Sequence, residues 1–309
     1  MPALDFHDYL KARRSLIDHA LERYLRGSKK QPQTLYRAMH YGVFSGGKRL
    51  RPILTLAAGE IFGGKHKYLL PFACALELIH TYSIIHDDLP ALDNDDLRRG
   101  ELASHKIFGE GIALLAGDAL LTEAFHLMSR PQVAQALKPK LVLEVLHEIA
   151  HAAGVGGLVG GQAVDLEAEG REVDVATVEY IHVRKTGALI LTAARVGARI
   201  GGATPKELRK ISRYGEFLGL AFQIADDILD AKGHNGSRVG SGGAGDKEKK
   251  KATYPSIVGV AASKSRAQEL LQHCLKEIEL FGKDADPLRG IARYVVEQAL
   301  LEPKMEDRR

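Results

Sequence analysis

Five aspartates accumulate directly behind a strongly apolar segment in the first third of the chain. They are Asp87, Asp88, Asp93, Asp95 and Asp96. No lysine or arginine occurs between Tyr68 and Leu97 to neutralise them, although an exposed helical face would normally offer basic partners one turn away. Because carboxylates packed this tightly repel one another, the cluster predicts a cation site. Pro90 should break the helix and let Asp93 turn back toward Asp87.

A second acidic segment, FQIADDILD, offers the same chemistry much later in the chain. Gln223, Asp226, Asp227 and Asp230 recur at offsets of 0, 3, 4 and 7, which places all four on one stripe of an α-helix. No basic residue occurs within 214–231. A solvated acidic face is the alternative for either segment alone, but two such segments in apolar helices argue against it.

The acidic side chains indicate which cation to expect. Hard carboxylate oxygens, without cysteine or a convincing histidine pair, suit magnesium better than zinc. Magnesium binds through one or two carboxylates plus substrate phosphates, so two facing half-sites predict a polyphosphate between them. An EF-hand would need a glycine and a glutamate at fixed offsets, and neither segment has them. A diphosphate also needs cations from the protein, and SGGKRLRP offers Lys48, Arg49 and Arg51.

The elements that position these residues are predicted to be helices. Apolar residues recur at offsets of three and four, for example at Phe72, Leu76 and Ile79, whereas no sustained alternating pattern indicates strands. Clusters of glycine and proline divide the chain into roughly ten helices. The only long polar loop, Lys232–Lys251, is too short for a linker between independent domains. We therefore expect an all-α fold in which residues 1–309 form a single domain.

Composition argues against several classes of protein. The net charge of +4 is modest, and the basic residues gather in DKEKKK rather than in a stripe interleaved with aromatic residues, so no nucleic-acid partner is expected. Glycines and charges interrupt every apolar run, so no membrane span is expected. The N-terminus lacks the order of a signal peptide, which predicts a cytoplasmic protein. The isolated Cys74 and Cys274 are expected to be core residues.

Six motifs follow one another along most of the chain. They are SGGKRLRP, HDDLPALDNDDLRRG, GGLVGGQAVDLEAEG, HVRKTGALI, FQIADDILD and KKATYP. Their order and content closely resemble the trans-isoprenyl diphosphate synthases. The spacing of Asp87, Asp88 and Asp93, with Leu-Pro inserted, is similar to that of bacterial farnesyl diphosphate synthases and related geranylgeranyl enzymes. The resemblance implies a large helical bundle of the isoprenoid synthase type with its active site in a central cavity, and a homodimer.

The resemblance also implies a role for each polar residue of these motifs. Isopentenyl diphosphate would lie in a metal-free basic pocket formed by Lys48, Arg51, His80 and Arg99. The allylic diphosphate would be held by Arg98, Lys185 and Gln223. The direct magnesium ligands would be Asp87, Asp93 and Asp226. The resemblance leaves two roles open for Asp88, Asp227 and Asp230: supporting ligands, or groups that contact the ligands without contacting the metal. Helical geometry agrees for His80 and Asp87, which are seven residues apart and so share nearly one face, about 10 Å apart along the axis.

The chemistry follows from this ligand set. Ionising an allylic diphosphate creates a carbocation and releases pyrophosphate, so the site must neutralise the leaving group and exclude water. Magnesium, Arg98 and Lys185 would serve the first need. Carbonyl and hydroxyl dipoles of Lys185 and Thr186, with the Gln223 amide, would stabilise the cation without trapping it. In the family the departing pyrophosphate takes the final proton, so no Ser/His/Asp arrangement is expected.

The product length is predicted from the residues that precede the first aspartate segment. The growing hydrocarbon must run back along that helix into an apolar tunnel. Tyr82 lies five residues before Asp87, about 7.5 Å down the axis, and an aromatic residue at this offset resembles the farnesyl-making enzymes. Tyr82 is also about 140° around the helix from Asp87, whereas Ser83 lies nearer that face. A tyrosine that simply packs between helices is therefore the alternative, and a geranylgeranyl product is the alternative to farnesyl diphosphate.

One position departs from the family pattern, in the loop after the second aspartate segment. The family usually has Gly-Lys where this chain has Gly240-Ser241. Lys247 or Lys249 could substitute, affinity for the allylic diphosphate could be reduced, or the loop could become ordered only with substrate. A non-catalytic partner subunit of another synthase is therefore an alternative, set below the enzyme because both aspartate segments are intact. A terpene cyclase would not need a second diphosphate pocket, and an acid-rich phosphohydrolase is a remoter alternative.

Overall fold

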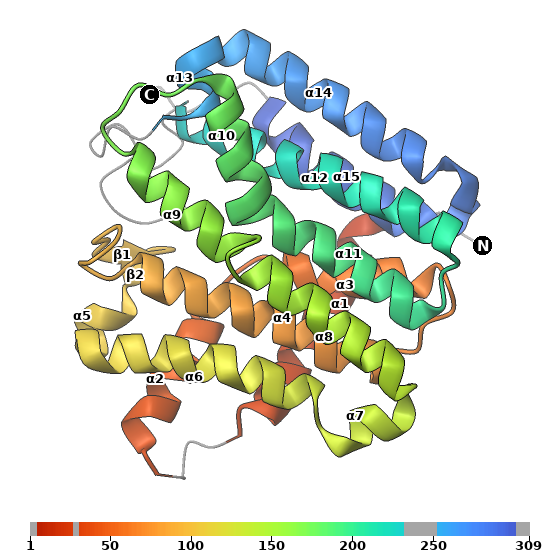
Figure 1. Cartoon of the computed structure of the whole chain (residues 1–309). Coiled ribbons are helices and arrows are strands. Elements are labelled where there is room, and N and C mark those ends of the chain that lie inside the picture. The colour runs from red at the N-terminus through yellow and green to blue at the C-terminus, as the bar shows by residue number, and fades with distance from the viewer. Residues whose placement is uncertain (1–4, 27–30, 232–251, 301–309) are drawn as a thin grey trace.

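Helices account for almost all of the computed structural model, which describes residues 5–26, 31–231 and 252–300 (Figure 1). The first helices are α1 (Phe6–Tyr24), α2 (Gln33–Phe44), α3 (Leu50–Glu60), α4 (His66–Asp87), α5 (Ser104–Phe108), α6 (Glu110–Met128), α7 (Pro131–Ala136) and α8 (Pro139–Ala153). They are followed by α9 (Leu158–Ala168), α10 (Val175–Ile181), the π-helix η1 (His182–Gly187), α11 (Ala188–Gly201), α12 (Pro205–Ala231), α13 (Tyr254–Val258), α14 (Val260–Glu277), the 3-10 helix η3 (Glu279–Ala285) and α15 (Asp286–Leu300). The predicted all-α class is confirmed.

The central element of the bundle is α4, which contacts α1, α2, α3, α6 and α11 (Figure 1). Its apolar residues lie on all sides of the helix rather than on one stripe, and Phe72, Leu76 and Ile79 are fully buried. A helix that is hydrophobic all round must be enclosed by protein. Cys74 in α4 and Cys274 in α14 are buried free thiols, as expected.

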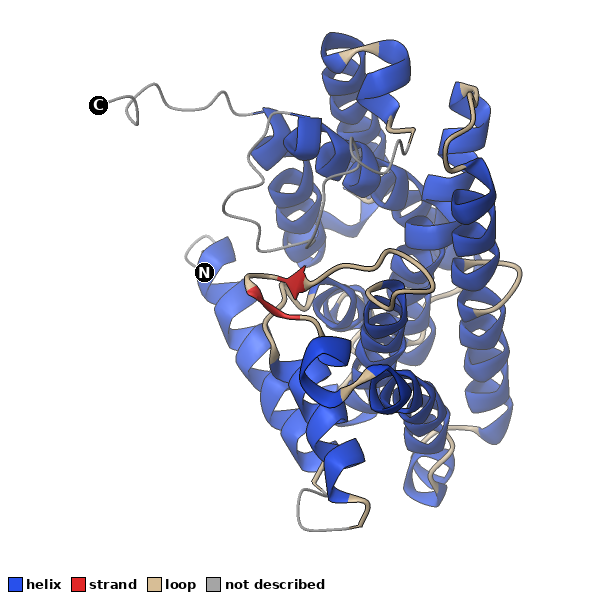
Figure 2. Ribbon diagram, turned by 90° about the vertical axis from the view of Figure 1, so that its left-hand side faces the viewer, coloured by secondary structure: helices blue, strands red, loops and turns tan. Residues whose placement is uncertain are grey.

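The described residues contain a single pair of short strands. β1 (Leu97–Arg98) pairs antiparallel with β2 (Glu101–Leu102), with Arg99 and Gly100 at the turn. Figure 2 faces the end of the bundle at which this hairpin lies. The C-terminal ends of α4, α9 and α12 lie toward the same end in Figure 1. The hairpin follows the first aspartate segment in the chain. It lies at the end of the bundle where α12, which carries the second aspartate segment, also ends.

The chain forms more helices than the roughly ten expected. Fifteen α-helices occur in the described residues, because single glycines interrupt helical segments as effectively as clusters do. Gly109 separates α5 from α6 with φ of 83°, and Gly259 separates α13 from α14 with φ of 84°. A positive φ is open to glycine at little cost, so each break needs only one residue.

Three helical segments are long and apolar enough to cross a membrane by length and composition alone. They are His66–Asp87, Glu110–Ala136 and Pro139–Ala168. The sequence expectation relied on uninterrupted apolar runs and missed them, because mean hydropathy over 18 residues tolerates a few polar positions. In the first segment 83% of that window is buried in the bundle, which explains its hydropathy; in the other two the buried share is 39%.

Candidate active site

The first aspartate segment leaves α4 at Asp87 and turns back on itself. The helix ends there, with Asp88 as its C-cap. The backbone N–H of Asp93 donates a 2.8 Å hydrogen bond to the carbonyl of Asp87. Asn94 has φ of 50°, a left-handed conformation that asparagine tolerates better than most residues. The prediction that the helix breaks near Pro90 and that Asp93 returns to Asp87 is confirmed.

The half-buried Asp87 carboxyl lies among other charges. Burial raises its pKa from 3.8 to about 6; the ammonium of Lys185 and the guanidinium of Arg98 oppose the rise, and the carboxylates of Asp93 and Asp88 add to it. A cation beside Asp87 and Asp93 would relieve this repulsion. The pair has the electrostatics of a half-site for a divalent metal.

Asp88 and Arg98 form an ion pair next to that half-site. The Nε of Arg98 donates to Oδ1 of Asp88 at 2.9 Å, its Nη2 donates to the same oxygen, and Asp95 lies 3.6 Å from Nη2. Burial raises the pKa of Asp88, and the hydrogen bond from Arg98 opposes that rise. Arg98 would therefore have to exchange carboxylate partners for phosphate oxygens to hold a substrate.

The π-helix η1 brings Lys185 next to the first half-site. Its Nζ donates a 2.7 Å hydrogen bond to Oδ2 of Asp165 on α9. Burial lowers the pKa of Lys185, but the charges of Asp165, Asp87 and Asp93 together raise it above its usual value. The two elements meet so closely that a Cβ at Gly161 would lie 2.2 Å from the backbone nitrogen of Lys185. Asp165 lies in a motif that the sequence singled out, yet its role was not predicted.

A hydrogen bond between Thr186 and Gln223 joins η1 to α12. The hydroxyl of Thr186 donates to Oε1 of Gln223 at 2.8 Å, and Nε2 of Gln223 donates to Oδ1 of Asp227 at 3.0 Å. Gly219 permits this approach, since a Cβ there would lie 2.7 Å from the Cα of the last η1 residue. Lys185, Thr186 and Gln223, predicted to act together, thus lie on two elements in direct contact.

Asp227 has a structural role that the sequence did not indicate. Its Oδ2 accepts a 2.8 Å hydrogen bond from the backbone N–H of Tyr254 and lies 3.3 Å from Nε2 of His182. The rings of His182 and Tyr254 stack with their centres 6.3 Å apart. Both carboxylate oxygens of Asp227 thus contact protein groups that link α12 to η1 and to the start of α13.

The carboxylates are divided between two segments rather than gathered in one cage. Within residues 5–26, 31–231 and 252–300, no three histidine, cysteine, aspartate or glutamate side chains converge closely enough to enclose a metal. An oxygen donor set that substrate phosphates complete is the usual arrangement for magnesium. The residues present therefore fit magnesium, with Asp87, Asp93 and Asp226 as the candidates to hold it.

The residues of the predicted basic pocket include Arg51, Arg99 and His80, which lie near one another and near Arg98 of the first aspartate segment. Burial lowers the pKa of His80 well below its usual value, and the neighbouring charges of Arg51, Arg99 and Arg98 lower it further, so the imidazole is neutral. Burial also lowers the pKa of Arg51 to about 10. The buried Nε of Arg51 has no hydrogen-bond partner in the part of the chain that the structure describes. A buried donor without an acceptor calls for one, and an anion would supply it.

The cations of SGGKRLRP point in different directions. Lys48 is exposed, with its ammonium 5.8 Å from the centre of the Tyr294 ring. Arg49 is turned into the protein, where its guanidinium donates to Asp18 and Glu77. The sequence offered Arg49 as a cation for a diphosphate, and this is wrong because two carboxylates engage it instead.

Comparisons with known proteins decide the family. A family model described as polyprenyl synthetase matches residues 32–285. The chain belongs to the polyprenyl synthetase family. It is 44% identical over 290 residues to a dimethylallyltranstransferase of Fischerella ambigua, covering 94% of this chain and 82% of that protein. It is 42% identical over 289 residues to a geranylgeranyl diphosphate synthase of Cyanophora paradoxa, covering 93% and 95% respectively.

The fold agrees with a solved structure of the family. The crystal structure of an FPP/GFPP synthase from Zymomonas mobilis matches with a TM-score of 0.84 at 36% identity, covering 94% of this chain and 99% of that one. This polyprenyl synthetase is therefore a prenyltransferase with the isoprenoid synthase fold, as the motifs predicted. The relatives are named for different products, so family membership does not fix the product length.

Tyr82 and Ser83 of this polyprenyl synthetase have different surroundings on α4. The buried Tyr82 ring meets the His86 ring edge-on at 5.6 Å. His86 in turn packs against α6, where a Cβ at Gly117 would lie 2.0 Å from its Nε2. The Ser83 hydroxyl donates to the carbonyl of His80 at 2.9 Å. Tyr82 thus packs toward α6, and control of chain length by either residue stays a prediction.

The position that departs from the family pattern lies outside the described residues. Gly240-Ser241, Lys247 and Lys249 all belong to the segment 232–251. The three interpretations of the missing lysine therefore stay predictions. Of the motif KKATYP, residues 252–255 are described, and Tyr254 contacts Asp227 as given above.

Proposed function

We propose that this prenyltransferase joins isopentenyl diphosphate to dimethylallyl diphosphate and then to geranyl diphosphate, giving farnesyl diphosphate. The proposal rests on one observation: two sites that could each bind a diphosphate lie next to each other. Lys185 lies with Asp87 and Asp93, and the pocket of Arg51 and His80 lies next to them. A reaction between two diphosphates needs both sites, one with metal and one without.

Departure of the allylic diphosphate is the step that the first half-site supports. Magnesium would be held by Asp87, Asp93 and Asp226. When bound, it would neutralise the negative charge on the oxygens of the leaving diphosphate. The Lys185 ammonium lies beside the first two carboxylates and would donate to the same diphosphate. As the carbon–oxygen bond breaks, the electron pair leaves with pyrophosphate, and preformed positive groups at that position lower the barrier.

The allylic carbocation is the species that Thr186 and Gln223 would stabilise. The amide oxygen of Gln223 already accepts a hydrogen bond from Thr186, so its dipole is held in position before substrate arrives. Neither group is a strong nucleophile, and neither would trap the cation. The double bond of isopentenyl diphosphate then forms the new carbon–carbon bond, and the proton lost from the adjacent carbon passes to the departing pyrophosphate.

The basic pocket would hold isopentenyl diphosphate without metal. Arg51 and Arg99 supply positive charge there, Lys48 approaches from the surface, and neutral His80 can donate a hydrogen bond without adding charge. The buried Nε of Arg51 has no acceptor among the described residues, so a diphosphate oxygen would satisfy it. This arrangement distinguishes a synthase from a terpene cyclase, which binds one diphosphate.

Product analysis tests the proposal. Purified protein with magnesium, isopentenyl diphosphate and either dimethylallyl or geranyl diphosphate should give mainly farnesyl diphosphate. A geranylgeranyl product would support the assignment as a prenyl diphosphate synthase but contradict the predicted length of the product. A cyclic hydrocarbon would indicate a terpene cyclase, and elongation only after a second synthase is added would indicate a partner subunit.

We also propose that two copies pair through the face formed by α6, α8 and α9, in which α8 contacts both α6 and α9 (Figure 1). Large apolar side chains are exposed there, including Leu115 at 52%, Leu143 at 67% and Val155 at 84%. Several large exposed apolar residues, in helices of high mean hydropathy, favour a face that is buried against another protein chain. Leu115→Glu should give a monomer in analytical ultracentrifugation, whereas Leu280→Glu, at an exposed leucine of η3, should not. A dimer unchanged by Leu115→Glu would reject this face.

A further inference from the structure

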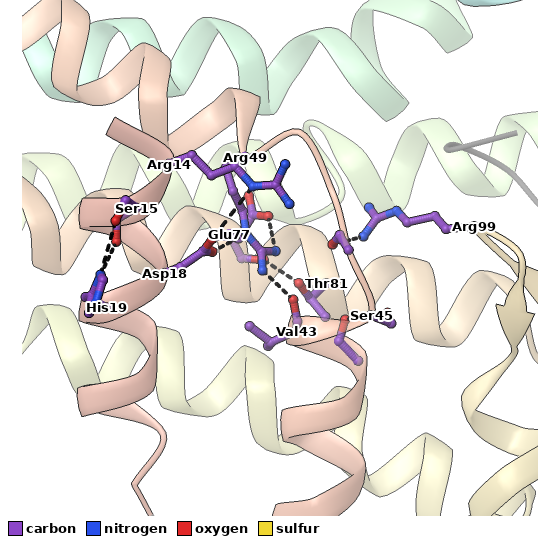
Figure 3. Close-up of polar contacts among 12 residues, drawn as sticks. Arg14, Ser15, Asp18, His19, Val43, Ser45, Arg49, Glu77, Thr81 and Arg99 are labelled. Atoms are coloured by element: carbon purple, nitrogen blue, oxygen red, sulfur yellow. Dashed lines mark hydrogen bonds and ion pairs between the residues drawn. The ribbon is translucent and has the colours of Figure 1, made fainter. Parts of the chain in front are cut away.

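A buried network of charged groups lies next to the loop that carries Lys48 and to the first turn of α3, which carries Arg51. Figure 3 shows Arg49 between Asp18 of α1 and Glu77 of α4. Its Nε donates to Oδ1 of Asp18 at 2.8 Å and its Nη1 donates to Oε1 of Glu77 at 2.9 Å. Its Nη2 donates to the carbonyl of Val43, near the end of α2, at 2.7 Å. One side chain thus ties α1, α2 and α4 to the start of α3.

Arg49 holds a backbone conformation that arginine seldom adopts. It has φ of 52° and ψ of 33° at the N-cap of α3, with 4% of its surface exposed. A left-handed conformation is costly for a residue with a long side chain and persists only where the surroundings enforce it. The three directed hydrogen bonds of the guanidinium provide that enforcement. Without them, we expect the turn between α2 and α3 to relax.

The basic residues beside Arg49 have different surroundings. Lys48 is exposed, and the Nε of Arg51 has no partner in the described part of the chain. Arg99 donates from the other side of the loop to the carbonyl of Gly46 (Figure 3). The left-handed turn at Arg49 therefore determines where two cations of the basic pocket stand.

Glu77 is the carboxylate under this cluster of arginines. It is 3% exposed and lies one helical turn before His80. Its charge acts on Arg49, Arg51 and Arg99, raising the pKa of each against the effect of burial. Arginine stays protonated in proteins, so what Glu77 supplies is electrostatic attraction to these guanidinium groups. A buried carboxylate close to an anion site repels the anion and would by itself weaken binding. Its presence here therefore points to a role in positioning the arginines.

We propose that Asp18, Arg49 and Glu77 are positioning residues for the isopentenyl diphosphate pocket. They do not contact the substrate; they fix the left-handed turn at Arg49 so that Lys48 and Arg51 stand ready for it. The inference rests on the proposed function, since it assumes that this pocket takes isopentenyl diphosphate. It predicts that damage to the network affects one substrate and spares the other.

Arg49→Lys is the first test, because lysine keeps the charge but replaces three directed donors with a single ammonium. The KM for isopentenyl diphosphate should rise about tenfold or more, while the KM for the allylic diphosphate and kcat at saturation change less than about twofold. Calorimetric titration of isopentenyl diphosphate in EDTA should show the same weakening. Circular dichroism and the Tm establish that the variant is folded.

The matched control is Arg13→Lys. Arg13 also joins α1 to α3, through a 2.7 Å contact of its Nε with Oε1 of Glu60, but neither residue belongs to the loop. Its substitution should leave both KM values unchanged. If Arg49→Lys fails to fold, Asp18→Asn replaces it, since it removes one charged acceptor from a partly exposed position; it should raise the same KM in the same selective way, by a smaller factor.

Glu77→Gln separates positioning from simple charge compensation. If Glu77 holds Arg49 in place, the KM for isopentenyl diphosphate rises; if Glu77 only offsets positive charge, its removal strengthens anion binding and that KM falls. A fall, an equal change in both KM values, or no change in Arg49→Lys and Asp18→Asn would overturn the inference. Failure of the proposed function would appear differently, as a wild-type protein that does not elongate either allylic substrate.

Discussion

Lys185 donates a 2.7 Å hydrogen bond from Nζ to Oδ2 of Asp165, which joins η1 to α9 beside the first aspartate half-site. The charge of Asp165 also raises the pKa of Lys185 against the effect of burial. The ammonium is therefore kept charged and held in one direction before any substrate binds. We expect Asp165 to act on the leaving diphosphate through Lys185.

Asp165→Asn should lower kcat by about tenfold to a hundredfold, because Lys185 loses the partner that orients it. Asp87 and Asp93 would still keep the ammonium charged, so the effect should come from position and not from a lost proton. Glu167→Gln, at an exposed position of the same helix, is the control and should behave as wild type in steady-state assays. Equal kcat values for the Asp165 variant and wild type would contradict this role.

Asp226→Asn should lower kcat at least about a hundredfold, because a carboxylate that holds the metal would be lost. Its Tm should stay near that of wild type. Titration with magnesium should show a higher concentration for half-maximal activity. Activity that is normal at low magnesium would show that Asp226 does not hold the ion.

Asp227→Asn should instead destabilise the protein. The side chain accepts hydrogen bonds from the backbone of Tyr254 and from Gln223. The asparagine amide would place an NH2 donor at one of these two acceptor positions. Loss of a buried hydrogen bond costs about 1–3 kcal/mol, measurable as a lower free energy of unfolding in urea. The adjacent Asp226→Asn is the matched control for this measurement. Equal unfolding free energies for the two variants would remove the structural distinction between these neighbours.

The raised pKa of Asp87 predicts a pH-dependent cost to stability in the absence of metal. Folding raises its pKa from 3.8 to about 6, so the unfolded chain ionises this carboxyl more easily. Below pH 3.8 both states are protonated and the residue contributes nothing. As pH rises through 6, the ionised carboxylate destabilises the folded state by at most about 3 kcal/mol.

Asp87→Asn removes that cost. In EDTA the variant should be more stable than wild type at pH above 6, and the difference should shrink as pH falls from 6 toward 3.8. Urea unfolding at several pH values measures it. Asp96→Asn is the control from the same loop: the Lys106 hydrogen bond lowers the pKa of that exposed carboxyl, so its variant should gain no stability. A pH-independent difference for Asp87→Asn would show that packing and not charge is responsible.

The sequence predicted the turn at Asp87 because local chemistry determines it. Pro90 cannot continue a helix, so the end of the helix followed from the sequence. The cation site was inferred from the five aspartates, since no lysine or arginine occurs between Tyr68 and Leu97, and it stays a prediction. The stripe from Gln223 to Asp230 was predictable for the same reason, since helical periodicity needs only spacing.

Contacts between distant segments were not predictable in this way. Arg49 looked equivalent to Lys48 and Arg51, and only Asp18 and Glu77, 31 and 28 residues away, turn it into the protein. The resemblance separated Asp226 from Asp227, but nothing in the sequence indicated that the backbone of Tyr254, 27 residues away, donates to Asp227. Charge type and spacing indicated the chemistry of these residues, but only their tertiary neighbours distinguish one of two adjacent side chains from the other.

Tyr82→Ala tests the product length. We expect the hydrocarbon chain to grow away from the carboxylates proposed to hold the metal. The buried Tyr82 ring packs against His86 between α4 and α6. If this ring closes the tunnel, its removal should shift the product from farnesyl diphosphate toward geranylgeranyl diphosphate or longer, measured by chromatography of the dephosphorylated products. Loss of a buried aromatic ring should also cost about 3–5 kcal/mol, so the assay belongs at a temperature well below the variant's Tm.

Ser83→Ala is the control for that substitution, because it changes the adjacent residue without opening comparable volume. It loses only the hydrogen bond to the carbonyl of His80 and should keep the wild-type product. If Ser83 lines the tunnel instead, enlarging it in Ser83→Phe should shorten the product, whereas Tyr82→Ala leaves the product unchanged. That pair of results would show that the tunnel ends at the face of α4 that Ser83 occupies, and not at the face that packs toward α6.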